Sequence, residues 1–145
     1  MLNKEEVIAK CQKNTLWVID GIGEAQSLRA EVVQDVTISE EFLSDMDCSN
    51  TLFMRVRFIG CVFNSVFFHN AAFKDCHFEG CSIIDCNFIG GVMTNTTFNM
   101  CFVRKGNFHR MSISEGKFTD CEFMSAPIWE ADLQHVSMNE CNFCR

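Results

Sequence analysis

The chain has 145 residues, of which 19 are acidic and 12 are lysine or arginine, so its formal net charge is −7. A chain of this length is expected to form a single hydrophobic core. The longest apolar run, Leu16–Ile19, is far too short to span a membrane, and charged residues precede it, so neither a membrane span nor a signal peptide is expected. Fifteen phenylalanines and no tyrosine indicate a dry core of aromatic rings without polar groups.

The N-terminal segment begins with a helix signal. Asn3 followed by Glu6 has the form of a capping box, in which each side chain bonds the other residue's backbone amide. Three apolar residues then share one helical face, namely Val7, Ile8 and Cys11. The pattern predicts a short helix over about residues 4–13. After it, Leu16–Ile19 ahead of Gly21 and Gly23 is typical of a short extended piece that ends in a turn.

The rest of the chain repeats itself every five residues, and such a period decides the fold before any helix or strand is assigned. From residue 51 onward every fifth position holds a large apolar residue. These residues are Phe53, Phe58, Phe63, Phe68, Phe73, Phe78, Ile83, Phe88, Met93, Phe98, Val103, Phe108, Ile113, Phe118, Phe123, Ile128, Leu133, Met138 and Phe143. Two positions before each stands a small or thin residue, and only Met111 is bulky there.

A period of five fits neither a helix, which would spread these residues around its circumference, nor a strand, which would alternate their faces. It is explained if the chain turns a corner at every unit and points one large and one small side chain inward, so that four units close a square coil. In these features the sequence resembles the pentapeptide repeat proteins. The resemblance covers nineteen units without a slip, and it implies an all-β fold, a right-handed quadrilateral β-helix.

The same phase extends backward through residues 31–50, but less regularly. Glu31 and Glu41 occupy small inward positions there, and unpaired carboxylates are costly to bury. We therefore expect an irregular first coil at 31–50, within a β-helix domain that covers 31–145 and is regular from residue 51. Residues 1–30 are expected to form a capping segment with a short helix over the open edge of that coil, which a solenoid needs to have covered.

Seven of the ten cysteines occupy the small inward position. Five of them, spaced by twenty residues, should stack as a column of thiols along one inner corner: Cys61, Cys81, Cys101, Cys121 and Cys141. Coils about 4.8 Å apart would bring adjacent Cα atoms within disulfide range. The favoured interpretation is nevertheless that cysteine acts as a compact hydrophobe, because a column of parallel side chains cannot close a tetrahedron around zinc. Free thiols fit a reducing compartment, so a cytoplasmic location is expected.

The sequence shows no motif of catalysis. It contains no phosphate loop, nucleophile elbow or HExxH. His69 and His109 share one outer column but lie two coils apart, at about 10 Å, which is too far to share a metal ion. Most carboxylates fall at corner positions, where they serve turns. We expect no enzyme activity, no metal site and no cofactor.

The resemblance also implies two alternatives for function. Some pentapeptide repeat proteins bind DNA gyrase or related type II topoisomerases as rods with the width and negative charge of DNA, and others are secreted bacterial effectors. Here residues 1–50 carry ten acids and four bases, whereas residues 51–145 carry nine acids and eight bases. A DNA mimic needs its negative field along the whole rod, so this distribution disfavours the gyrase alternative. The effector alternative stays open.

The preferred function is a non-catalytic protein-binding or scaffold module for a partner that the sequence does not identify. One face presents the apolar residues Phe67, Ile89 and Trp129, and its neighbour presents Ile84, Phe102 and Met124. Contiguous apolar surface usually marks a contact, although such residues can also pack along their own face. The face centred on Phe58, Phe78, Phe98 and Phe118 is mainly polar outside.

Two further expectations concern other partners. Direct nucleic-acid binding is not expected, because Arg104, Lys105, Arg110 and Lys117 form no continuous basic stripe. Self-association is expected through the last coil, where unpaired backbone groups would stand beside the core residues Leu133, Met138 and Phe143. Two such edges can cover each other about a two-fold axis, which predicts a homodimer joined near residues 133–145.

Overall fold

Each five-residue unit turns its corner at a residue in the left-handed backbone region. The structure is a computed structural model that describes residues 1–145. Every fifth residue from Ala30 to Glu140, with the exception of Glu130, has a φ between +48° and +70°. Half of these corner residues are Asp, Asn or Gly, the types that adopt this conformation at least cost. The corners therefore impose the square coil that the period of five predicts.

The segments between corners form three parallel sheets of six strands each. The first face consists of β1 (Val32–Gln34), β4 (Leu52–Met54), β7 (Ala72–Lys74), β10 (Val92–Thr94), β13 (Ser112–Ser114) and β16 (Asp132–Gln134). The second face consists of β2 (Thr37–Ser39), β5 (Arg57–Ile59), β8 (His77–Glu79), β11 (Thr97–Asn99), β14 (Lys117–Thr119) and β17 (Ser137–Asn139). The third face consists of β3 (Phe42–Ser44), β6 (Val62–Asn64), β9 (Ser82–Ile84), β12 (Phe102–Arg104), β15 (Glu122–Met124) and β18 (Asn142–Cys144).

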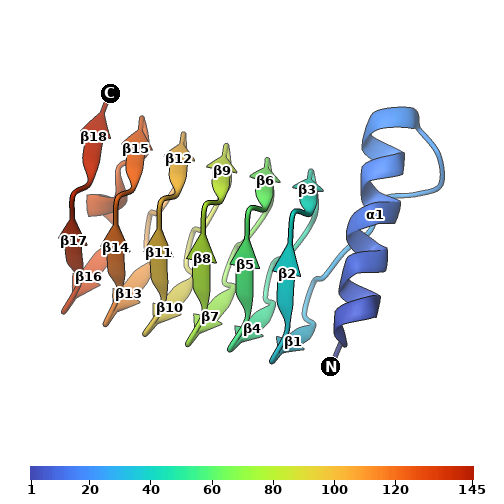
Figure 1. Cartoon of the computed structure of the whole chain (residues 1–145), viewed down its shortest axis with the longest axis horizontal. Coiled ribbons are helices and arrows are strands. Elements are labelled where there is room, and N and C mark those ends of the chain that lie inside the picture. Colours follow the sequence, from blue (N-terminus) through green and yellow to red (C-terminus); the bar gives the residue numbers. More distant parts are fainter.

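The fourth side, here called the turn face, has turns and isolated bridges in place of strands. Its last turn is a 3-10 helix, η1 (Ile128–Glu130). The four sides make six stacked coils: coil 1 (31–50), coil 2 (51–70), coil 3 (71–90), coil 4 (91–110), coil 5 (111–130) and coil 6 (131–145). The coils form a rod with the chain termini at opposite ends (Figure 1). The predicted quadrilateral β-helix is confirmed.

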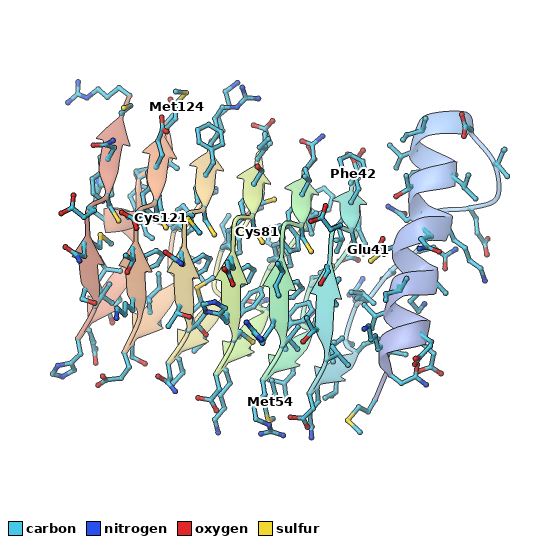
Figure 2. The ribbon with its side chains drawn as sticks, viewed as in Figure 1. Glu41, Phe42, Met54, Cys81, Cys121 and Met124 are labelled. Atoms are coloured by element: carbon cyan, nitrogen blue, oxygen red, sulfur yellow. The ribbon has the colours of Figure 1, made fainter.

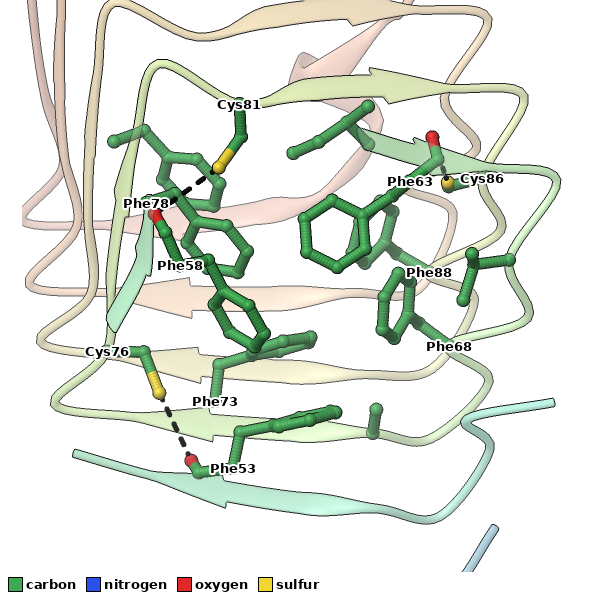
Figure 3. Packing of buried hydrophobic residues seen from close by; sticks show 14 of the residues in the cluster. Phe53, Phe58, Phe63, Phe68, Phe73, Cys76, Phe78, Cys81, Cys86 and Phe88 are labelled. Atoms are coloured by element: carbon green, nitrogen blue, oxygen red, sulfur yellow. Dashed lines mark hydrogen bonds between the residues drawn. The ribbon is translucent and has the colours of Figure 1, made fainter. Parts of the chain in front are cut away.

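Each strand pairs with the strand twenty residues further on, so equivalent residues stack. Phe98 lies opposite Phe78 in one direction and Phe118 in the other. Their ring centroids are 4.5 and 4.8 Å apart, with planes within 7° of parallel. Rings in one coil also meet edge to face, as Phe53 and Phe58 do at 5.6 Å (Figure 3). The core is thus a set of aromatic columns, and its one internal void measures about 10 Å³ and has only apolar walls.

Cysteine and threonine at the small inward position do more than fill space. The Cys76 Sγ donates to the carbonyl oxygen of Phe53 at 3.3 Å, and the Cys81 Sγ donates to that of Phe58 at the same distance (Figure 3). Thr96 donates its hydroxyl to Phe73 in the same way. These side chains therefore bond the backbone of the preceding coil, a role that treating cysteine as a plain hydrophobe leaves out.

The N-terminal helix is longer than the sequence predicts. The helix α1 (Lys4–Asp20) has the expected capping box between Asn3 and Glu6. The prediction that Leu16–Ile19 is extended is wrong, because these residues continue the helix to its end at Gly21, whose φ is +66°. No proline or glycine interrupts the chain before Gly21, so nothing stops the helix earlier. No helix in the structure is long and apolar enough to cross a membrane.

The helix α1 lies across the open edge of coil 1 (Figure 1). The buried Asn14 side chain donates to the Ser44 carbonyl at 2.6 Å and accepts from the Gln26 amide at 2.9 Å. Because Asn14 bonds both the coil and the loop that follows α1, its burial leaves no polar atom unpaired. Coil 1 has the same three strands as later coils, and Glu31 and Glu41 are only half-buried at its edge.

Replacing one ring of an aromatic column by a carboxylate should unfold the protein. Phe98→Asp puts an unpaired charge between two stacked rings, and we expect a loss of at least about 4 kcal/mol in the free energy of unfolding. Asn99→Thr, one residue on and facing outward, should change it by less than about 0.5 kcal/mol. Urea denaturation followed by circular dichroism measures both. A folded Phe98→Asp protein with unchanged stability would contradict the stacked core.

Candidate protein-interaction surface

The turn face is shaped by side chains that bond their own backbone. Asp47, Asn87 and Asn107 occupy the same place in coils 1, 3 and 4. The side-chain oxygen of each accepts the backbone N–H two residues on, at 3.0 to 3.1 Å, which fixes the turn. Phe67 and Pro127 occupy the equivalent positions in coils 2 and 5 without such an oxygen. The two exceptions replace a turn-forming side chain by an apolar one.

The most exposed aromatic side chains of the repeat lie on this turn face. Trp129 is 63% exposed and Phe67 is 47% exposed, whereas Ile89 between them is half-buried. The Phe67 ring lies against His69 with centroids 6.2 Å apart. Trp129 meets the edge of Phe143 at the same distance. Both aromatic residues thus have neighbours on one side and solvent on the other.

The third face carries its apolar residues differently. Ile84, Phe102 and Met124 are all half-buried. Strands in register about 4.8 Å apart let outward side chains lie along one another, and the side chain of Met124 projects from this sheet (Figure 2). The structure therefore separates the six predicted contact residues into two groups, of which the turn-face group is the more accessible.

The second face is polar outside. Glu79 lies 3.6 Å from the His77 Nε2 and 4.0 Å from an Arg57 nitrogen. A shallow groove runs along the same face, with a floor at Phe98 and walls of polar side chains: His77, Thr97, Asn99, Lys117 and Thr119. These residues come from three adjacent coils, and the groove offers no apolar anchor to a partner.

The sign of the charge differs between coils, so no single sign extends along the whole rod. Coil 1 holds six acidic residues and no lysine or arginine, whereas coil 4 holds three basic residues and no acid. Part of the acidic charge is paired with neighbouring coils. The Arg55 guanidinium donates two hydrogen bonds to Asp35, and with a further hydrogen bond from Gln34 this lowers the pKa of that carboxyl to about 2.

The comparison with protein families agrees with this geometry. A family model described as pentapeptide repeats matches residues 43–80 with eight copies, and the same five-residue geometry continues through all six coils. Residues 43–80 are thus pentapeptide repeats.

Solved structures of pentapeptide repeat proteins are similar to this chain at low identity. Rfr23 from the cyanobacterium Cyanothece 51142 is 8% identical with a TM-score of 0.49, over 91% of this chain and 97% of that one. HetL from Nostoc sp. strain PCC 7120, which is involved in heterocyst differentiation regulation, is 7% identical with a TM-score of 0.40, over 98% and 95%. Full-length QnrB1, a plasmid-mediated fluoroquinolone resistance protein, is 10% identical with a TM-score of 0.33, over 78% and 86%. No curated protein matches the chain. Because the identities and TM-scores are this low, no function of these proteins is transferred to this chain.

The last coil exposes some of the residues that hold the large inward position. Leu133 is 37% exposed and Phe143 is 45% exposed, and Met138 is half-buried. In the inner coils the equivalent residues, such as Ile113 and Phe123, are at most 2% exposed. The three residues predicted for a dimer contact thus lie together at one end of the rod.

A second exposed apolar area lies at the end of α1, where the sequence predicted an extended piece. It comprises Leu16, Trp17, Ile19 and Ile22. A helix predicted through residues 14–20 would have placed Leu16, Trp17 and Ile19 on the outside, since the inner face is defined by Val7, Cys11 and Asn14.

Most of the inward thiols are buried, and one pair near the C-terminus has the CxxC spacing. Eight cysteines are buried, Cys141 is half-buried and Cys144 is exposed. Burial raises the pKa of the Cys11 and Cys86 thiols to about 12. Cys141 and Cys144 have the CxxC spacing, but three residues of extended chain separate their Cα atoms by about 10 Å, so they cannot close a disulfide or share a metal ion.

Thiol labelling should follow this burial. At pH 8 a maleimide should label Cys144 at once and Cys141 more slowly, because both lie at the open end of the rod. The other eight should react only after unfolding, since they are buried and the reagent cannot reach them. Mass spectrometry counts the labels, and Cys144→Ser should remove the fast one. Rapid labelling of any of the eight in the native state would contradict the packing.

Proposed function

We propose that this protein is a non-catalytic protein-binding module whose main contact surface is the turn face. The observation that carries the proposal is the exposure of Trp129 and Phe67 on a face where other coils place turn-forming polar residues. Tryptophan and other large aromatic side chains are among the residues that most often dominate binding energy. The ten free thiols support a reducing location such as the cytoplasm.

The rod also favours this class of function mechanically. Each coil is bonded to its neighbours on three sheets, so the turn face is held rigid and little conformational entropy is lost on binding. Phe67 and Trp129 are three coils apart, about 14 Å along the rod. A partner segment of a few residues in extended conformation spans that distance.

Truncating the turn-face tryptophan should weaken partner binding. With the protein as bait in a lysate pull-down, Trp129→Ala should capture less of a specific partner than the wild type does. The expected loss in binding free energy is about 2 kcal/mol or more, which is roughly 30-fold in affinity. Val92→Ala is the matched control, since Val92 is 44% exposed on the first face. Phe102→Ala tests the third face. Equal capture by the wild type and Trp129→Ala would contradict a turn-face contact.

Modulation of DNA gyrase or a related topoisomerase is the second candidate, and the six acidic residues of coil 1 are the feature that favours it. Asp35 is paired with Arg55, and Asp47 lies 4.0 Å from Arg29. The negative charge of coil 1 is therefore partly neutralised. Coils 2 and 4 carry only basic charges, which interrupts any field that mimics DNA. A supercoiling assay decides between the candidates, since only a modulator changes the activity at micromolar concentration. Secretion as an effector is a third candidate that no structural feature favours.

We also propose a homodimer through coil 6, resting on the exposed Leu133 and Phe143 beside the unpaired edge of β16–β18. An uncovered parallel edge of this kind readily pairs with another chain. The same edge from a second copy can cover it about a two-fold axis.

Sedimentation velocity should show this dimer. Phe143→Lys places a charge at the centre of the contact and should raise the dissociation constant at least about 100-fold, as loss of a central apolar anchor does. Val92→Lys, which adds the same charge to the first face, should leave the dimer intact. A monomeric wild type, or a dimer unaffected by Phe143→Lys, would exclude this contact.

A further inference from the structure

The backbone ladder between coils is interrupted at one place on the turn face. In coil 2, the amides of Phe68 and Asn70 donate to the Asn87 and Ile89 carbonyls of coil 3. In coil 3, the amides of Phe88 and Gly90 donate in the same way to coil 4, at 2.8 and 3.2 Å. The equivalent amides of coil 4 belong to Phe108 and Arg110, and neither donates a hydrogen bond.

The cause of the interruption is Pro127. In the regular pattern the Asn107 amide donates to the Cys86 carbonyl, but proline has no N–H for the equivalent bond to Gly106. The bridge series along this face accordingly ends at Asn107. One carbonyl of coil 5 that would accept from coil 4, that of Pro127, instead accepts from the Glu130 amide in η1 at 3.1 Å. Glu130 is also the corner residue that lacks a positive φ.

The two unpaired amides lie in the most basic coil. Lys105, His109 and Arg110 are all exposed on or beside the turn face, and none of them forms a salt bridge. Trp129 follows His109 in the next coil and is 63% exposed. The nearest acidic residues by position are Asp85 and Glu130, which share the corner columns of Lys105 and Arg110 respectively.

We propose that the step between coils 4 and 5 on the turn face binds a phosphate monoester. Two free backbone N–H groups, with an arginine, a lysine and a histidine exposed on or beside the same face, supply the donors that an anion requires. The dianionic phosphate, with three acceptor oxygens, can use all of these donors at once. Trp129 would lie beside the group that carries the phosphate.

The ligand is a phosphorylated side chain of a protein, an assignment that rests on the proposed function. A nucleic-acid backbone would extend over the neighbouring coils, and coils 3 and 5 each carry more acidic than basic residues. Their charges repel a polyanion that runs along the rod. A single phosphate confined to coil 4 avoids that repulsion.

The test is a titration of the purified protein with inorganic phosphate, followed by amide chemical shifts. The Phe108 and Arg110 amides should shift along one saturable curve, while Phe88 and Gly90, which are paired, should not. Pro127→Asn restores the residue that coils 3 and 4 have at this position, and hence the missing ladder, without removing any basic side chain. It should raise the dissociation constant for phosphate at least tenfold.

Arg110→Gln, which leaves the backbone unchanged, should weaken phosphate binding by a similar factor. Arg104→Gln removes the same charge from the third face of coil 4 and should change binding less than twofold. Unchanged binding in Pro127→Asn, or equal losses in both arginine variants, would overturn the site. A phosphotyrosine peptide should bind more tightly than inorganic phosphate, and tighter binding of a single-stranded oligonucleotide than of that peptide would overturn the ligand assignment. Because the titration needs no partner, its failure is distinct from failure of the pull-down.

Discussion

The backbone hydrogen bonds between successive coils are the interaction on which the rest of this molecule depends. They hold each strand in register with the strand twenty residues away on three sides of the rod, and that register forces identical positions to stack. The spacing of parallel strands, about 4.8 Å, is also a favourable distance for stacked aromatic rings. Phe78, Phe98 and Phe118 exploit this coincidence with centroid distances of 4.5 and 4.8 Å. A tyrosine hydroxyl would find no partner in such a column, which accounts for the composition.

The sequence predicts the repeat region well because the five-residue period determines which side chains point inward. The inward positions of Phe58 and Cys81 follow from counting by five, and the structure places them there. The N-terminal segment lacks that constraint, so its helix was predicted too short. The helix was predicted over about residues 4–13, but the Asn14 side chain bonds Ser44 in the fold, and this tertiary contact favours continuation.

The surface was harder to predict, because inward positions follow from the period but exposure does not. Met124 and Trp129 hold the same position in the five-residue unit, yet one is half-buried in a sheet and the other is exposed on a turn. Trp129 also follows Pro127, which has no N–H for the bond that Asn107 makes to the preceding coil. The exposed tryptophan and the two unpaired amides of the basic coil therefore lie at the same step of the turn face.

Amide hydrogen exchange tests most directly whether the ladder sets the structure and is interrupted where we describe it. The account predicts strong protection for the second-face amides of β11 and for Phe88 and Gly90, whose hydrogen bonds join coils 3 and 4. Phe108 and Arg110, one coil further on, should exchange at least about 100-fold faster, because a closed hydrogen bond is what retards exchange. Equal protection of Gly90 and Arg110, or weak protection throughout β11, would contradict it.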